Sequence, residues 1–332
     1  MRPTPCIISG VGRLEEWNAL YDQTLYRCGV LPSAYFCTMD TRTRFLSHLE
    51  GRFADFFGQE VRILGSSDVT GGDINQCQRL DTTAGRYFIK ANAGLFGLDL
   101  FEKEARGLVT LANAGEFKVP RPLFDGRFHQ QVYLVMEWMD KGQTGPAYWR
   151  DFGTSLARLH RHGSDSFGFD HDNYIGRLHQ SNRRHAGGAD FLAQERILPL
   201  AKKAFERRLL SNDDLACAES LCNRLESLLP AEPPALLHGD LWSGNCMCLS
   251  DGRPAIFDPA VHFGHRETDL AMTLLFGGFD ASFYQAYDET YPMTPGWRER
   301  VGLFQVYPLL VHLLLFGGGY RARVADLLSK WG

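Results

Sequence analysis

Strand-like runs begin at Val61, in the first half of the chain. They are short and separated by glycine-rich turns, which is typical of neighbouring antiparallel strands. These runs are Val61–Leu64, Gln76–Leu80 and Arg86–Lys90. A longer apolar run, Val132–Met139, predicts a buried strand. This part of the chain is therefore expected to form a small β-sheet.

Segments with a helical spacing of apolar residues lie before, between and after these predicted strands. The segment Asp99–Glu116 repeats apolar residues every three or four positions and predicts one helix. An earlier helical pattern begins near Met39, and after Gly145 the chain is mostly helical. The apolar run Leu309–Phe316 predicts a buried helix. The expected fold class is α+β, with a small antiparallel β-sheet lobe followed by a larger helical lobe.

The same change of pattern divides the chain into three parts. Residues 1–38 are poorly patterned and are expected to be an extension of unknown role, so Met1 and Met39 both remain open as the physiological start. Residues 39–140 are expected to form the first lobe, and residues 141–332 the second. The hinge between the lobes is placed near Glu137–Gly145.

Composition and charge narrow the class of protein. The chain has 332 residues, 44% of them hydrophobic, which is enough for a two-lobed enzyme with sizeable cores. Its net charge of −4 argues against a broad nucleic-acid surface, and no apolar stretch approaches membrane-spanning length. The eight cysteines are scattered, which is typical of a cytosolic protein whose thiols are reduced. Cys246-x-Cys248 has no second Cys/His pair to complete a zinc site. We therefore expect a cytoplasmic protein with neither nucleic acid nor a membrane as its partner.

The most informative motif lies between residues 238 and 260. His238-Gly239-Asp240 is followed by Asn245, five positions after the aspartate, and then by Phe257-Asp258-Pro259. Protein kinases place a catalytic aspartate and a magnesium-binding asparagine at this separation, with a second metal-binding aspartate further along the chain. The alternative, a polar turn between two strands, leaves the flanking residues unexplained. The motif therefore indicates phosphoryl transfer by a two-lobed, protein-kinase-like fold.

The motif also predicts a role for each of its side chains. Asp240 is expected to be the base that orients the attacking hydroxyl, and Asn245 and Asp258 are expected to ligate Mg²⁺ at the phosphates of ATP. His238 is expected to brace the loop by hydrogen bonding rather than to take part in the chemistry. Because Asp258 continues directly into residues 264–273, no long activation loop is expected.

The nucleotide is expected to bind in the first lobe. A glycine turn between two predicted strands would let the backbone approach phosphates closely. This turn consists of Gly71, Gly72, Asp73, Ile74 and Asn75. Lys90 would reach the α- and β-phosphates, and Glu104 on the following helix would hold it in place. The alternative for this pair is a solvated strand end and a solvated helix face. Backbone groups of Glu137 and Met139 are expected to bind adenine.

Taken together, these residues resemble the motifs of a known family. The chain resembles the fructosamine kinase, or ketosamine-3-kinase, family, within the aminoglycoside phosphotransferase-like branch of the kinase fold. The resemblance runs from about Phe45 to the C-terminus and depends on four stretches. They are Gly71–Asn75, Phe167–Gly176, Leu236–Asn245 and Phe257–Phe279. Trp242 and the long stretch after Asp258 are more specific than the general phosphotransferase signature.

The resemblance implies ATP-dependent phosphorylation of a sugar hydroxyl on ketosamines, the rearranged adducts of glucose or ribose with amines. The phosphorylated adduct then breaks down and frees the amine, so the family acts in protein repair by deglycation. Ketosamine small molecules or glycated proteins would be the partners. Related enzymes also raise two readings of Cys77: the cysteine of a redox-sensitive homodimer, or a buried and inert thiol in a monomer.

Trp242 and His312 are the candidates for the acceptor side of the site, and a core position is the alternative for each. The chain departs from the family pattern at Val261-His262-Phe263 and at Tyr307-Pro308, which bears on substrate shape more than on phosphoryl transfer. Two further groups are expected to be structural. They are a loop with Asp170, Asp172 and Asn173, and an ion pair between Arg266 and Asp269 at a helix start.

Two other functions remain open. A kinase for an aminoglycoside, choline or homoserine-like substrate would keep Asp240, Asn245 and Asp258 but would lack the context of Trp242 and the Phe-Gly-Gly-Phe stretch. A silent nucleotide-binding scaffold would not need the complete set of phosphoryl-transfer residues that the chain carries.

Overall fold

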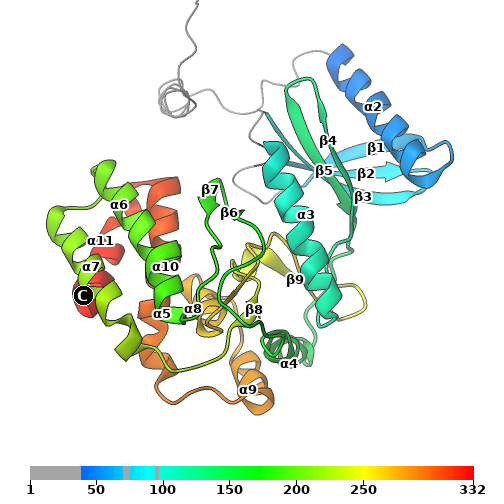
Figure 1. The fold of residues 1–332 in the computed structure, drawn as a ribbon. Coiled ribbons are helices and arrows are strands. Elements are labelled where there is room, and N and C mark those ends of the chain that lie inside the picture. The colour runs from blue at the N-terminus through cyan, green and yellow to red at the C-terminus, as the bar shows by residue number, and fades with distance from the viewer. Residues whose placement is uncertain (1–38, 70–74, 94–96) are drawn as a thin grey trace, which may run out of the picture.

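The structure is a computed structural model that describes residues 39–69, 75–93 and 97–332. It has two lobes (Figure 1), the first built on a five-stranded sheet and the second mostly on helices. This arrangement confirms the predicted α+β class, with the sheet lobe first in the chain.

The sheet of the first lobe is antiparallel throughout, in the order β1-β2-β3-β5-β4. Its strands are β1 (Ile63–Asp68), β2 (Gln76–Thr82), β3 (Gly85–Ala93), β4 (Pro122–Phe128) and β5 (Gln131–Glu137). All strands except β4 overlap a predicted run, although β1 lies slightly further along the chain than expected. The apolar pattern does not predict β4, because its side chains are all half-buried or exposed.

Alternation along β5 determines where the two helices of this lobe pack. These helices are α2 (Met39–Phe57) and α3 (Gly97–Ala114). Val132, Leu134 and Met136 lie in one core with α3, whereas Tyr133 and Val135 lie in another core with α2. Because successive side chains of a strand point to opposite faces, a continuous apolar run is what a strand covered on both sides requires.

The second lobe combines helices with short hairpins. Its helices are α4 (Tyr148–Leu159), α5 (Gly188–Phe191), α6 (Leu198–Glu206), α7 (Asn212–Leu228), α8 (Glu267–Leu275), α9 (Ala281–Thr290), α10 (Trp297–Phe316) and α11 (Arg321–Trp331). A π-helix, Leu192–Ile197, joins α5 to α6. The hairpins pair β6 (Asn173–Ile175) with β7 (Leu178–Gln180), β8 (Ala235–Leu237) with β11 (His262–Gly264), and β9 (Cys246–Cys248) with β10 (Pro254–Ile256).

α10 is the central helix of this lobe and confirms the buried helix predicted for Leu309–Phe316. Among the described residues it is the one helix long and apolar enough to cross a membrane by length and composition. Most of its side chains are buried, and it contacts α6, α8 and α11. A helix that is apolar on all sides and covered by other helices is a core helix.

The two lobes share one hydrophobic core. Phe101 and Leu108 of α3 belong to the same buried cluster as Phe152 of α4, Leu236 of β8 and Val261. The hinge segment between the lobes, near Glu137–Gly145, is also fixed to the second lobe, because Gly142 N donates to Cys248 O at 2.8 Å. α3 is therefore packed against both lobes, which places its polar face next to the loops that follow β8 and β10.

Two buried histidines make stability depend on pH. Burial, with Arg196 nearby, lowers the pKa of His262 to about 3, and burial lowers the pKa of His265 to about 4. The unfolded chain takes up these protons near pH 6.5, so folding stability is complete above that value and falls as the pH drops toward 4. We expect a loss on the order of 2 kcal/mol per histidine between pH 7 and pH 5.

The measurement is the free energy of unfolding in urea at pH 7 and pH 5. His262→Asn keeps a donor for Ala260 O, which His262 Nδ1 contacts at 3.0 Å, and removes the titrating ring. We expect this variant to lose less stability between the two pH values than the parent. His129→Asn, at an exposed turn position, is the matched control and is expected to keep the parental slope. An equal slope in all three proteins would contradict the assignment.

Candidate active site

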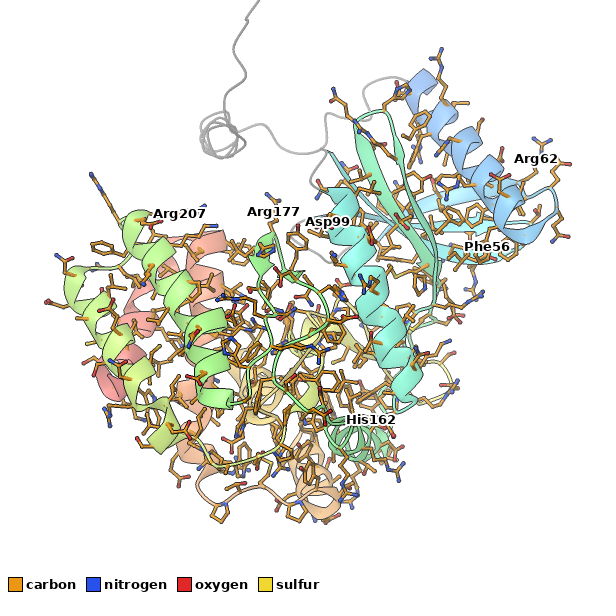
Figure 2. All side chains as sticks on the ribbon, in the orientation of Figure 1. Phe56, Arg62, Asp99, His162, Arg177 and Arg207 are labelled. Atoms are coloured by element: carbon orange, nitrogen blue, oxygen red, sulfur yellow. The ribbon has the colours of Figure 1, made fainter. Side chains whose placement is uncertain are left out.

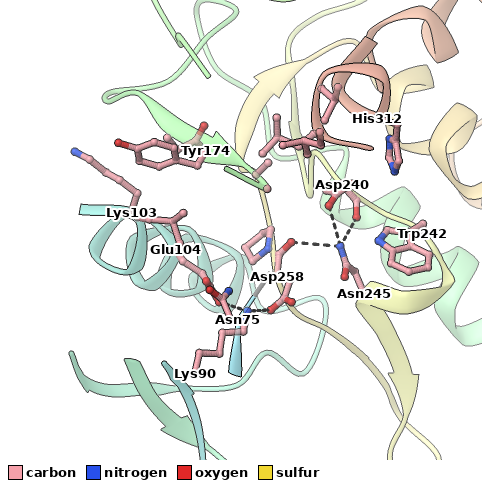
Figure 3. Close-up of a pocket in the computed structure, with 18 of the residues that line it drawn as sticks. Asn75, Lys90, Lys103, Glu104, Tyr174, Asp240, Trp242, Asn245, Asp258 and His312 are labelled. Atoms are coloured by element: carbon pink, nitrogen blue, oxygen red, sulfur yellow. Dashed lines mark hydrogen bonds and ion pairs between the residues drawn. The ribbon is translucent and has the colours of Figure 1, made fainter. Parts of the chain in front are cut away.

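A cavity of about 530 Å³ opens between the two lobes (Figure 3). Most residues singled out in the sequence line it. They are Asn75, Lys90, Glu104, Asp240, Trp242, Asn245, Asp258 and His312. Gly71, Gly72, Asp73 and Ile74 lie outside the described residues. Residues up to 237 positions apart in the sequence thus meet in one cleft, as the kinase interpretation requires.

Asp240, Asn245 and Asp258, the three key residues of the motif, come together at the base of the cleft. Residues 238–245 leave β8 and end in a short 3₁₀ turn, Ser243–Asn245. Asn245 Nδ2 donates to Asp240 O at 2.9 Å and to Asp240 Oδ2 at 3.1 Å, and it lies 3.5 Å from Asp258 O. Because the amide nitrogen is directed at Asp240, Oδ1 is the atom of Asn245 left for a cation.

Asp240 has the properties of a base that works near neutral pH. Its carboxylate is partly buried in the cleft, and burial, together with the nearby charge of Asp258, raises its pKa to about 7. General-base catalysis is most efficient when the pKa of the base lies near the working pH. The environment of Asp240 therefore suits proton transfer from a hydroxyl.

Lys90 lies between two carboxylates. Alternation along β3 directs Lys90 toward α3, and the side chain is almost fully buried, with 4% of the residue exposed. Lys90 Nζ donates to Glu104 Oε1 at 2.8 Å and also to Asp258 Oδ1. Burial alone would lower the pKa of Lys90, but the two carboxylates outweigh burial and raise it. The interpretation of Lys90 and Glu104 as solvated surface groups is therefore wrong.

Asp258 has an unusual backbone conformation. Its φ of 56° lies in the left-handed region, which non-glycine residues rarely occupy. Such conformations persist where surrounding contacts enforce them, and they are concentrated at functional sites. Here the ion pair with Lys90 and the close approach of Asn245 hold the residue in the cleft.

Asp269 supports the start of the loop 238–245. Its buried carboxylate accepts hydrogen bonds from His238 N at 2.8 Å and from Gly239 N at 2.9 Å, and it lies 3.3 Å from His160 Nε2. The predicted ion pair between Arg266 and Asp269 is therefore wrong. Because Asp269 points into the lobe toward these backbone groups, it does not reach Arg266.

Arg266 instead joins the helix start to neighbouring loops. Its guanidinium donates twice to the Glu232 carboxylate, at 2.8 Å in both cases, and lies over the ring of Tyr291. His238 has the bracing contact expected of it, since its Nε2 lies 3.0 Å from Phe257 O. Burial lowers the pKa of His238, which favours the neutral ring.

An aromatic cluster forms the opposite wall of the cleft. Trp242 and His312 both contact Phe276, with ring centroids 5.8 and 4.9 Å away, and His312 also lies beside Phe316 and Tyr320. Phe276 and Phe316 are 40% and 47% exposed, which is high for large apolar side chains. Trp242 also packs partly on the core of the lobe, so it faces both the cavity and the interior.

The sequence pattern did not assign some residues of the cleft. Phe276, Phe316 and Tyr320 on the aromatic wall belong to this group, as do Lys103 and Tyr174 on the opposite side. The phenylalanines carry one usable signal, because each is followed by Gly-Gly at a helix end: Phe316 is the last residue of α10, and Phe276 directly follows α8. Exposed apolar residues that are grouped together, as these are around His312, often mark binding surfaces.

The loop with Asp170, Asp172 and Asn173 is structured, as predicted. Asp172 Oδ1 accepts from Asn182 N at 2.8 Å, and the buried Asn173 side chain donates to Val261 O at 2.8 Å. Asn173 also lines the cavity, so this loop forms part of the cleft wall.

The predicted adenine contacts do not lie on this cavity. Glu137 N donates to Arg121 O at 2.8 Å, and the Glu137 carboxylate binds Lys118. Met139 is buried in a small cluster with Leu249. The N–H of Glu137 is thus already in use, and adenine binding by backbone groups at 137 and 139 stays a prediction.

Cys77 lies in the wall of the cleft as a buried thiol. Burial raises the pKa of Cys77 to about 11, so the unreactive thiol form dominates at neutral pH. Among the residues that the structure describes, no group of three or more His, Cys, Asp or Glu side chains is arranged to hold a metal ion.

Comparisons with known proteins agree with this geometry. Residues 47–331 match the family described as Fructosamine kinase. A "Probable ketoamine kinase" of Synechocystis sp. is 40% identical over 82% of this chain and 92% of its own length. A "Protein-ribulosamine 3-kinase, chloroplastic" of Arabidopsis thaliana is 32% identical over 82% of this chain and 84% of its own length.

Solved structures support the same fold. A Thermobifida fusca protein assigned as a fructosamine-3-kinase is 36% identical, with a TM-score of 0.75 over 85% of this chain and 97% of that one. An aminoglycoside phosphotransferase is 15% identical, with a TM-score of 0.55 over 85% of this chain and 98% of that one, and this likeness shows the fold alone. The predicted protein-kinase-like, two-lobed fold is confirmed.

Proposed function

Because the chain belongs to the fructosamine kinase family, we propose that it transfers the γ-phosphoryl group of ATP to a sugar hydroxyl of a ketosamine. The observation that carries this proposal is the convergence of Lys90, Asp240, Asn245 and Asp258 in one cleft whose other wall is aromatic. Breakdown of the phosphorylated adduct would free the amine, which makes the chain a deglycation enzyme. Free ketosamines and glycated proteins are both candidate substrates.

The geometry supports one division of labour. The sugar hydroxyl oxygen attacks the γ-phosphorus while the bond to the bridging oxygen of ADP breaks, and the hydroxyl proton passes to the Asp240 carboxylate. Lys90 exchanges its contact with Asp258 for the nucleotide phosphates and keeps its contact with Glu104. Trp242 and His312 orient the acceptor against Asp240, which lowers the entropic cost of reaction.

The donor set suits Mg²⁺. The amide oxygen of Asn245 and the carboxylate of Asp258 are hard oxygen ligands beside Asp240, and Mg²⁺ in proteins is commonly held by one or two such groups together with phosphates and water. When bound, the ion would neutralise charge on the transferring phosphoryl group. We assign Asn245 and Asp258 as its protein ligands.

Several further assignments belong to this proposal. Residues 39–140 would form the nucleotide-binding lobe, and residues 141–332 would hold the catalytic loop and the acceptor site. The cytoplasm is the proposed location. For the oligomeric state, the buried Cys77 favours a monomer over a redox-sensitive homodimer.

A substrate panel tests the proposed function. The protein is incubated with ATP, Mg²⁺ and, separately, a fructosamine, a ribulosamine, an aminoglycoside and choline, and ADP release and new phosphate esters are measured by ³¹P NMR. We expect phosphorylation of the ketosamines only. Turnover confined to the aminoglycoside or choline would favour a small-molecule kinase of the neighbouring groups, and no turnover at all would favour a silent scaffold.

Trp242→Ala is expected to raise the KM for the ketosamine strongly and to leave the KM for ATP within about threefold, because the ring contacts the acceptor and not the nucleotide. His312→Ala should act in the same direction more weakly. Truncation of a buried tryptophan costs roughly 3–5 kcal/mol, so thermal unfolding must be measured first.

The control is Trp149→Ala, which truncates a partly buried tryptophan that packs on Phe279 away from the cavity. It is expected to lower stability without changing either KM. A folded Trp242→Ala protein with unchanged ketosamine kinetics would show that the acceptor binds elsewhere.

A further inference from the structure

α3 carries Glu104, so the position of this helix decides whether Lys90 is held in place. Glu104 Oε1 and Lys90 Nζ are 2.8 Å apart, and a small rotation or slide of α3 would separate them. Asp258 leads directly into β11 and α8, which leaves no long segment after it to fix the helix. The contacts that fix α3 come from the few residues after Asp258 and from another part of the second lobe.

One face of α3 meets the loop 167–176. The Tyr174 hydroxyl donates to Asp99 Oδ2 at 2.6 Å, and Arg106 Nη2 donates to Asp170 Oδ2 at 3.2 Å. Asp99 and Arg106 are seven positions apart and therefore lie on the same face of the helix, two turns apart. Figure 2 shows Asp99 at the end of α3 that faces the β6–β7 hairpin, whose turn carries Arg177.

Gly107 brings the same helix against the segment that follows Asp258. A Cβ atom at residue 107 would lie 3.3 Å from Val261 Cγ2 and 3.4 Å from Pro259 Cγ. These distances are at or below the lower end of ordinary contacts, so α3 packs on this segment about as closely as a helix can.

The loop 167–176 is tied to that segment as well. Gly168 and Phe263 exchange two backbone hydrogen bonds, of 2.9 and 2.8 Å, and Asn173 Nδ2 donates to Val261 O at 2.8 Å. Asn173 Oδ1 in turn accepts from the side chains of Gln180 and Asn182. The loop, α3 and the segment after Asp258 therefore form one packed unit, and Lys90 binds this unit through Glu104 and Asp258.

We propose that the loop 167–176 is a positioning element that holds α3 in the place where Glu104 keeps Lys90 ready for the nucleotide phosphates. Tyr174 of the loop and Asp99 of α3 are the positioning residues. Their hydrogen bond joins the two lobes directly, and it links the helix that carries Glu104 to the strand that borders the acceptor cavity. The inference rests on the proposed nucleotide role of Lys90 and not on the identity of the acceptor.

The test compares Asp99→Ala, Tyr174→Phe and the double variant in the full chain. Nucleotide affinity is measured by calorimetry with a non-hydrolysable ATP analogue and Mg²⁺, and kcat is measured with the best acceptor. We expect each single change to weaken nucleotide binding about three- to thirtyfold and to lower kcat. A change of this size matches the coupling energies found between linked sites in other proteins. Because both changes break the same hydrogen bond, the double variant should bind the nucleotide no more weakly than the weaker-binding single variant.

Conservative and control variants separate positioning from other roles. Asp99→Asn keeps an oxygen that can accept from Tyr174 and is expected to restore affinity to within about twofold of the parent. Glu102→Ala removes an exposed carboxylate from the same helix and is expected to have no effect. Hydrogen exchange should quicken in α3 and remain unchanged in α10 when Tyr174 is replaced by phenylalanine.

Three results would overturn the inference. They are unchanged nucleotide affinity in both single variants, effects that multiply in the double variant, and a change confined to the acceptor KM. The last result would make Tyr174 an acceptor contact, since Tyr174 lines the cavity and Asp99 does not. Because nucleotide affinity is measured without an acceptor, the test stands even if no ketosamine is phosphorylated.

Discussion

Asp240→Asn is expected to lower kcat about 10²- to 10⁴-fold while nucleotide binding stays close to that of the parent. Asparagine has nearly the same shape but cannot take the hydroxyl proton. The Asp240 carboxylate accepts a hydrogen bond from Asn245 Nδ2 at 3.1 Å, and the amide oxygen of an asparagine can accept the same bond. The loop should therefore keep its conformation, so that the loss reports on the chemistry.

Asp258→Asn is the matched comparison for this result. It makes the same chemical change at the proposed metal ligand, where Lys90 also loses a charged partner. We expect it to weaken binding of the Mg²⁺–nucleotide complex itself, as measured by calorimetry. If the Asp240 variant phosphorylated sugars at a near-normal rate, Asp240 could not be the base.

Asp269→Asn is expected to lower the free energy of unfolding by about 2–4 kcal/mol and kcat by at least roughly tenfold. Burial would raise the pKa of Asp269, but His160 and nearby groups such as Gly239 N lower it, so the carboxylate is ionised. Asparagine has one acceptor oxygen for two backbone N–H groups, and its amide would face a donor. Both the stability of the lobe and the position of the catalytic loop depend on this carboxylate.

The comparison variant is Asp251→Asn. Asp251 also accepts two hydrogen bonds, from Arg253 N and Nε, but it lies at the surface. Urea unfolding should show little change in stability for this variant, because surface substitutions of this kind have small effects. Equal stability losses in the two variants would mean that burial of the Asp269 hydrogen bonds has no special weight.

Local sequence patterns predicted most of the elements that place the chemistry. β2, β3 and α3 were predicted nearly at their observed bounds, because alternation and helical spacing reflect burial on one or both faces. β4 escaped prediction because it lies at the edge of the sheet with no fully buried side chain. Asp240, Asn245 and Asp258 could be found from their spacing together with the flanking residues, since a loop and a hairpin keep them close in both sequence and space.

Residues whose role depends on packing between distant segments could not be found in this way. Asp269 seemed a natural partner for Arg266, three positions away, yet it binds the backbone of residues 238 and 239. The contact between Asp99 and Tyr174 joins residues 75 positions apart, and no local pattern links the two. Such contacts are fixed by how the lobes meet, which local periodicity does not record.

The position of α10 in the chain has a consequence for biogenesis. This apolar helix fills the centre of the second lobe, yet its twenty residues leave the ribosome after those of α6, α7 and α8. Until they emerge, α6, α7 and α8 lack the surface on which their apolar side chains pack in the finished protein. The nascent second lobe is therefore exposed to aggregation during synthesis, and chaperone binding at that stage should matter more for its yield than for that of the sheet lobe.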